Sequence, residues 1–211
     1  MPAAQHAGHG AAAGVFAAAA TMWFAMMVAM MLPTVLPWIL LFARMSRARG
    51  GGARETWSFV AGYLLAWLGY SLLAAGIQVP LAAAAALHGP DLRVAPAAGG
   101  AILLAAGLFQ FTSLKRRCLT HCRSPLGYLL ARWTDGPAAA ISLGIRHGVY
   151  CVICCAALMA VSFALGVMNL WWMAALTAVL CVEKALPAGD RLGRAFGVVL
   201  VVWGCRNAFL G

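Results

Sequence analysis

The sequence predicts an all-α membrane protein, a polytopic bundle of six transmembrane helices. Of its 211 residues, 64% are hydrophobic and only 9% are charged, whereas soluble domains average about half apolar and about a quarter charged residues. The apolar residues fall into runs long enough to cross a bilayer, because a transmembrane helix needs roughly 20 mostly apolar residues. Short segments that are basic or contain Gly and Pro separate these runs, so the sequence indicates one helical domain and no soluble domain.

The predicted helical domain covers residues 14–211 and follows a short flexible tail, residues 1–13, that contains His6 and His9. Asn169 is expected to cap the fifth helix. Asp190 is expected to cap the sixth, because it ends a Pro-Ala-Gly-Asp turn signal. The second span has room to continue past Pro80 into a run of alanines. The six predicted spans are residues 14–43, 55–79, 96–114, 138–167, 170–186 and 192–209.

The positive charges between the spans predict their orientation. Because cytoplasmic loops carry an excess of Lys and Arg, the three basic groups are expected in the cytoplasm and both termini on the outer, periplasmic side. The expected location is therefore the bacterial inner membrane, with the lipid bilayer as surroundings. This topology explains the net charge of +10 without a nucleic-acid partner. The three groups are Arg44, Arg47, Arg49 and Arg54; Lys115, Arg116, Arg117, Arg123 and Arg132; and Lys184, Arg191 and Arg194.

A metal-binding pattern stands out in the fourth predicted span. His147, Cys151 and Cys154 fall on one face of a helix, with Cys155 beside them. Imidazole and thiolate together suit Cu(I), zinc or iron, and thiolates favour Cu(I) and zinc. The alternative is packing, because a free cysteine is also a good small apolar residue. Three cysteines within five residues, behind a histidine, favour metal or redox chemistry.

A second pattern of the same kind lies at the cytoplasmic end of the third span. Cys118, His121 and Cys122 occur there, and on a continued helix the two cysteines lie one turn apart on one face. The charge rule places this group on the same side of the membrane as His147. The two groups are therefore expected to share one ion. The alternative is a solvated basic loop that happens to contain two cysteines.

Two further features are weaker. Met22, Met26 and Met30 form a stripe on the first span, either as soft thioether ligands that pass Cu(I) inward or as flexible packing. Glu183 lies near the inner end of the fifth span, where an ionisable residue is a functional candidate. Pairing with Lys184, or reaching the membrane interface, is the competing explanation.

Five motifs in order make the chain similar to an uncharacterised bacterial family of predicted metal-binding integral membrane proteins. The resemblance runs from about residue 22 to residue 204 and implies metal ligands, with no established metal, reaction or partner. The motifs are AMMVAMMLPTVLP, FQFTSLKRRCLTHCRSP, HGVYCVICCAALM, GVMNLWWMA and EKALPAGD. The matching positions are Cys118, Cys122, His147, Cys151, Cys154 and Cys155, with Met26, Met30, Pro33, Asn169, Glu183 and Lys184 as accessories. This chain has Ala156 where the family often has tryptophan.

The leading functional hypothesis is a membrane protein that handles a soft metal, Cu(I) first and zinc as the alternative, for transport or for delivery to a metallochaperone or membrane enzyme. A thiol-redox membrane protein is a second hypothesis, and an accessory subunit of a larger membrane enzyme is a third. The sequence has no Gly-rich phosphate loop, nucleophile elbow or close pair of carboxylates. Its seven cysteines exclude a complete disulfide framework, because their number is odd.

Overall fold

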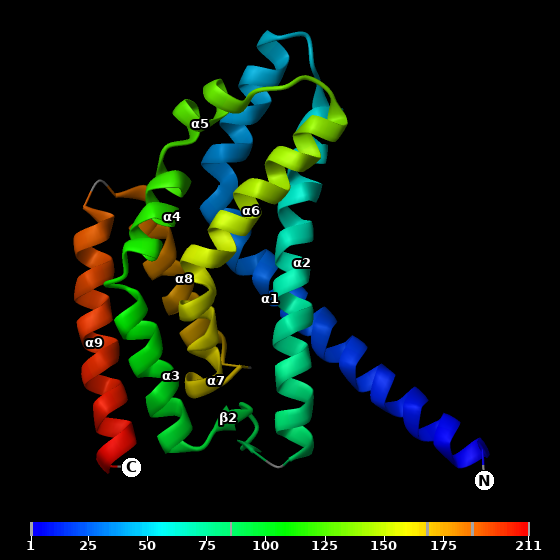
Figure 1. The fold of residues 1–211 in the computed structure, drawn as a ribbon, viewed down its shortest axis with the longest axis vertical. Coiled ribbons are helices and arrows are strands. Elements are labelled where there is room, and N and C mark those ends of the chain that lie inside the picture. The colour runs from blue at the N-terminus through cyan, green and yellow to red at the C-terminus, as the bar shows by residue number, and fades with distance from the viewer. Residues whose placement is uncertain (1, 85, 168, 187, 211) are drawn as a thin grey trace.

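The chain folds into helices and one short two-stranded ribbon in this computed structural model (Figure 1). The structure describes the backbone of residues 2–84, 86–167, 169–186 and 188–210, and the side chains from residue 12 to residue 209 within those ranges. The helices are α1 (Pro2–Ala48), α2 (Ala53–Ala83), α3 (Pro96–Phe109), α4 (Ser113–Arg123), α5 (Pro125–Arg132), α6 (Pro137–Ala160), α7 (Ser162–Leu165), α8 (Leu170–Ala185) and α9 (Gly189–Leu210), and the ribbon pairs β1 (Leu87–His88) with β2 (Arg93–Val94).

The predicted all-α class is confirmed, and the number of spans is supported only in part. Within the described residues, α1, α2 and the α6–α7 stretch are long and apolar enough to cross a membrane, by length and composition. Where the sequence predicts one straight span over 96–114, the structure has α3 and α4 with a bend of 65° between them. They make a fourth candidate if they count together as one span.

The bend between α3 and α4 gives the second cysteine group a helix of its own. Thr112 caps α4, because its hydroxyl accepts a hydrogen bond from the Lys115 backbone N–H at 3.2 Å. The predicted Asn169 cap of α8 is confirmed by a bond of 3.3 Å from the Trp172 N–H. The predicted Asp190 cap is wrong: Asp190 lies inside the first turn of α9, which begins at Gly189, two residues before the start that a cap at this position requires.

Close packing between α2 and α6 fixes the position of the cysteine helix. At Gly144 a side-chain carbon would collide with the Phe59 carbonyl, and at Gly62 it would collide with the Ile141 carbonyl. Glycine therefore lets the two backbones touch, as small residues do in tightly packed membrane helices. In Figure 1, α6 runs obliquely next to α2.

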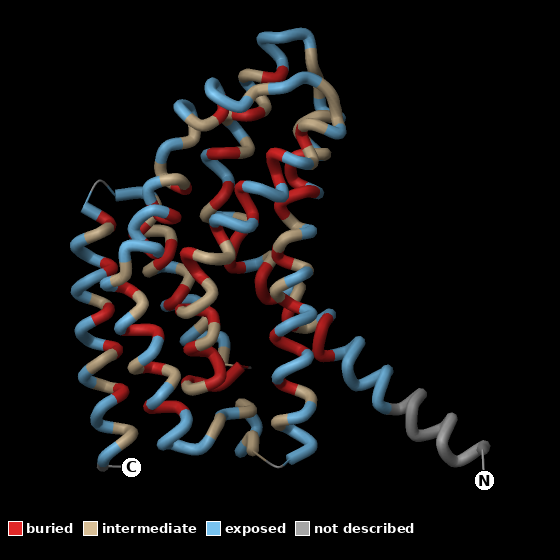
Figure 2. The backbone as a smooth tube through the Cα atoms, in the orientation of Figure 1, coloured by how far each residue is buried: buried red, intermediate tan, exposed pale blue. Residues whose placement is uncertain are grey.

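The buried residues gather where α1, α2, α4, α6 and α8 face one another (Figure 2). In contrast, α9 exposes large apolar side chains, including Val198, Val202 and Phe209. The structure includes residues 2–13 in α1, and residues 12–18 of this helix are exposed and run away from the bundle. The side chains of His6 and His9, in the predicted tail, lie outside the described part.

Candidate metal centre

Three cysteine sulfurs of α6 form a compact cluster. Cys151, Cys154 and Cys155 share a helix face because they are spaced three and four residues apart. Their Sγ atoms all lie within 4.8 Å of one another, and each residue is at most 1% exposed. The Sγ atoms of Cys154 and Cys155 are 3.3 Å apart. We call these three residues the sulfur cluster.

A fourth sulfur reaches the sulfur cluster from α4. The Sγ of Cys122 lies 3.9 Å from that of Cys154. Trp38 of α1 holds this end of α4 by donating its indole N–H to the Cys122 carbonyl at 2.7 Å. Cys118, one turn earlier on α4, is also buried and lies in the core outside the three-sulfur group. The structure thus brings the two predicted cysteine groups together through Cys122.

Lys184 of α8 brings a positive charge to the sulfur cluster. Its Nζ donates to the Sγ of Cys151 and to the hydroxyl of Thr34, each at 3.1 Å. The Tyr63 hydroxyl of α2 lies 3.3 Å from the same sulfur. None of the ion pairs in the described part of the chain includes Lys184. The Lys184 ammonium is therefore placed to offset the negative charge of a metal–thiolate centre at Cys151.

The partner of Glu183 differs from the residue that the sequence suggested. Glu183 does not pair with its neighbour Lys184; its Oε2 accepts from the Nζ of Lys115 at 2.8 Å. The side chains are 3% exposed for Lys115 and 0% for Glu183, so the alternative interpretation of this segment as a solvated basic loop does not hold for Lys115. Lys115 also donates to the Cys154 carbonyl at 2.9 Å. The ion pair therefore ties α4 and α8 to the cysteine helix.

The two predicted imidazole ligands lie in a buried stack of aromatic rings. The ring of His147 packs on Trp38 with 3.8 Å between centroids, and the ring of His121 packs on Tyr150 at 4.0 Å. The centroids of the two imidazoles are 6.0 Å apart. His147 Nδ1 and His121 Nε2 are buried without a hydrogen-bond partner. Neither residue belongs to the three-sulfur group, and their role as ligands stays a prediction.

The predicted methionine stripe faces the interior of the bundle. Met26 and Met30 are 6% and 2% exposed, and Met22 is partly buried against the core. Met31, from the same stretch, places its sulfur 3.9 Å from the Thr34 hydroxyl that binds Lys184. This burial fits both a packing role and a ligand role. Of the other accessory residues, Asn169 serves as the cap of α8.

Sequence reasoning missed the residues that surround the sulfur cluster. Tyr63, Thr34 and Trp38 each hydrogen-bond a cysteine or Lys184, and each comes from a helix distant in sequence. No local spacing links them to α6. Only Trp38 carried a weak sequence signal for a role in the site. It directly follows the second of two prolines in the helix, and its indole N–H is a hydrogen-bond donor that needs a partner when buried.

The donor set of the cluster suits a soft ion. Metal–thiolate bonds of about 2.3 Å place three sulfurs of a planar site about 4 Å apart, which agrees with sulfurs that lie within 4.8 Å of one another. All seven cysteines are free thiols. The sulfurs are buried away from water, so hard ions that prefer oxygen ligands find no suitable donors at these three positions.

The fold and this cluster define a mostly helical protein with a buried group of cysteine sulfurs that could hold a soft metal ion. The chain belongs to the family described as "PpoB2: Copper chaperone", whose sequence profile matches residues 20–206. No curated protein and no solved structure matches the chain significantly. This family supports the expectation of a metal-binding protein, and its description names copper as the metal.

Proposed function

We propose that this protein is a copper chaperone of the bacterial inner membrane that holds Cu(I) in the sulfur cluster and delivers it to a partner protein. The observation that carries the proposal is the convergence of Cys151, Cys154 and Cys155 within 4.8 Å, with Cys122 at 3.9 Å from Cys154. Thiolate ligands favour Cu(I) among the soft ions. The copper chaperone family supports the same choice.

Charge balance supports Cu(I) at this depth. A buried ion is costly unless its charge is compensated. Cu(I) bound by two thiolates carries a single negative charge, which the ammonium of Lys184 offsets at 3.1 Å from Cys151. Lys115 does not contribute, because Glu183 already neutralises it. The centre is then close to neutral, and a third thiol completes the site.

Metal analysis after purification under reducing conditions tests this function. We expect one Cu(I) per chain after incubation with Cu(I), and loss of that copper when all three cluster cysteines are replaced by serine. Binding of zinc in preference to Cu(I), or equal copper in the serine variant, would contradict the proposal. A reversible two-thiol oxidation without bound metal would instead favour the thiol-redox hypothesis.

We further propose that all six predicted segments cross the membrane, with α8 and α9 as the last two. At about 1.5 Å per residue, the 22 residues of α9 reach about 33 Å and are long enough for a hydrocarbon core of about 30 Å. The 16 residues of α8 reach only about 24 Å, so α8 crosses where the bilayer thins around it. The exposed valines of α9 suit a lipid-facing surface. A reporter domain that functions only in the periplasm is expected to be active when it is fused to either terminus. Activity at either terminus of a reporter that functions only in the cytoplasm would refute this topology.

A further inference from the structure

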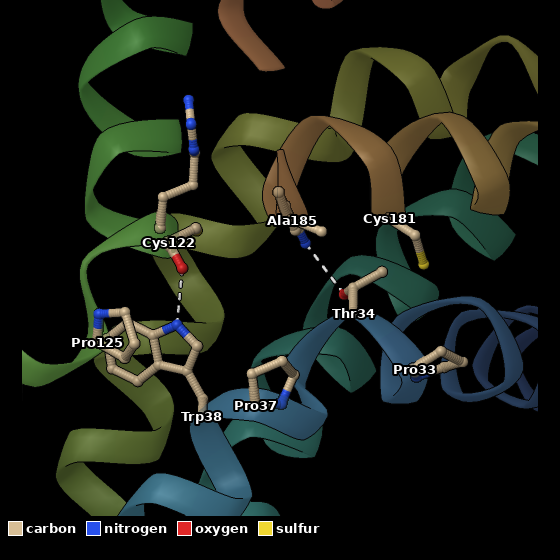
Figure 3. A pocket seen from close by; sticks show the side chains of 10 residues that line it. Pro33, Thr34, Pro37, Trp38, Cys122, Pro125, Cys181 and Ala185 are labelled. Carbon is tan, nitrogen blue, oxygen red and sulfur yellow. Dashed lines mark hydrogen bonds between the residues drawn. The ribbon is translucent and has the colours of Figure 1, made fainter. Parts of the chain in front are cut away.

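A cavity of about 350 Å³ lies beside the sulfur cluster, between α1, the α4–α5 corner and α8 (Figure 3). We call it the access cavity. Its volume is in the range of small-molecule sites. Its wall on the α1 side comes from the stretch with two prolines, Pro33 and Pro37, which have no N–H for the helix ladder. Thr34 and Trp38 line the same wall.

Two residues connect the access cavity to the sulfur cluster. Lys184 lines the cavity, and its Nζ bonds the Sγ of Cys151 at 3.1 Å. Cys122 also lines the cavity, and its sulfur lies 3.9 Å from that of Cys154. An ion or small molecule inside the cavity can therefore contact two side chains, Lys184 and Cys122, that themselves contact the sulfur cluster.

The charge of the access cavity selects the form in which copper can enter. Arg123 and Lys184 both line it, and none of the described lining residues is acidic. Asp190 lies 3.5 Å from Arg123 and compensates it in part, whereas Lys184 takes part in no described ion pair. A positive potential repels a bare cation and attracts an anion. Cu(I) held by two small thiolates is such an anion.

The access cavity also contains a thiol that the sulfur cluster does not use. Cys181 lies one helical turn before Lys184 on α8, so the two share a face. It is partly exposed and free. In Figure 3 its sulfur is on the same side of α8 as Thr34 and Pro33 of α1. A soft ligand thus lines the access cavity one helical turn from Lys184.

We propose that the access cavity admits Cu(I) as an anionic bis-thiolate complex and that Cys181 is the first protein ligand to receive it. In the exchange, a bond forms between copper and the Cys181 sulfur while one bond between copper and the carrier sulfur breaks. The proton of the Cys181 thiol leaves with the departing carrier thiolate, and copper remains Cu(I) throughout. A second exchange of the same kind passes the ion to Cys151 beside Lys184. The inference rests on the proposed function, since it needs copper as cargo.

Loading kinetics of the full-length protein in detergent test the inference. The probe is Cu(I) in excess 2-mercaptoethanol, and protein-bound copper is measured after rapid desalting at successive times. Cys181→Ser is expected to slow loading about tenfold or more, because an exchange step loses its ligand, with the same final copper content as wild type. Cys205→Ser, which removes a thiol of α9 outside the cavity, is the control and is expected to load at the wild-type rate.

The dependence of the loading rate on ionic strength tests the role of the cavity's charge. Higher ionic strength screens the cavity, so we expect slower loading from the anionic thiolate complex and faster loading from the cationic acetonitrile complex of Cu(I). Wild-type loading rates in Cys181→Ser, or the opposite salt dependence, would overturn the inference while leaving the copper site intact. A wild-type protein that binds no Cu(I) would overturn the proposed function itself.

Discussion

Replacing Cys154 by serine is expected to weaken Cu(I) binding by at least about 100-fold, because loss of a metal ligand costs more than the 10- to 100-fold typical of an outer-shell partner. Cys154 is central to the site: its sulfur lies 3.3 Å from that of Cys155 and 3.9 Å from that of Cys122. Serine has nearly the same size and retains a donor for the Cys151 carbonyl, which the Cys154 thiol approaches at 3.2 Å. The fold should therefore survive the change. Competition with a chromophoric Cu(I) chelator measures the affinity.

Two other cysteines provide matched comparisons for Cys154. Cys205→Ser changes an exposed thiol of α9 and is expected to leave the affinity unchanged. Cys118→Ser changes a buried thiol one turn from Cys122, outside the three-sulfur group, and is expected to have a much smaller effect than Cys154→Ser. Equal affinities in Cys154→Ser and wild type would contradict the assigned site.

Replacing Glu183 by glutamine is expected to lower the free energy of unfolding by about 3–5 kcal/mol, the cost of leaving one partner of a buried ion pair without its counter-charge. The two side chains are 3% and 0% exposed, so water does not compensate the Lys115 ammonium. The pair also anchors α4 and α8 to the Cys154 carbonyl. Denaturant unfolding in detergent micelles, followed by tryptophan fluorescence, measures the loss.

The Glu183 prediction has a rescue and a control. The double variant Lys115→Met, Glu183→Gln removes both charges and is expected to regain much of the lost stability, because no buried charge is then left without its counter-charge. Asp190→Asn removes the partner of Arg123 in a more exposed pair at 3.5 Å, and about 0–1 kcal/mol is expected there. Unfolding of Glu183→Gln at the wild-type midpoint would show that the pair carries no stability.

Helical periodicity alone was enough to group the α6 cysteines. The spacing of Cys151, Cys154 and Cys155 puts them on one face whatever the rest of the fold does, and the structure brings their sulfurs together. The charge rule placed Cys122 at the same depth, and its sulfur is next to that of Cys154. Local rules succeed here because one helix supplies three of the four sulfurs.

Tertiary contacts explain the rest, and local patterns could not supply them. Lys184 is adjacent to Glu183 in sequence, but successive side chains of a helix do not face each other. Glu183 turns to Lys115, 68 residues away, and Lys184 turns to Cys151. The break after Phe109 has neither Gly nor Pro, so the apolar run looked continuous. In this stretch, only Thr112, a residue type that often caps helices, indicates that a new helix begins.

The central claim is that sulfur atoms of α6 hold Cu(I), and X-ray absorption spectroscopy of the copper-loaded protein tests it most directly. We expect an edge typical of Cu(I) and a first shell of three sulfurs at about 2.3 Å, the length of a metal–thiolate bond. With Cys154→Ser, the number of sulfurs should fall. A first shell made of nitrogen or oxygen, or a spectrum that Cys154→Ser leaves unchanged, would contradict the account.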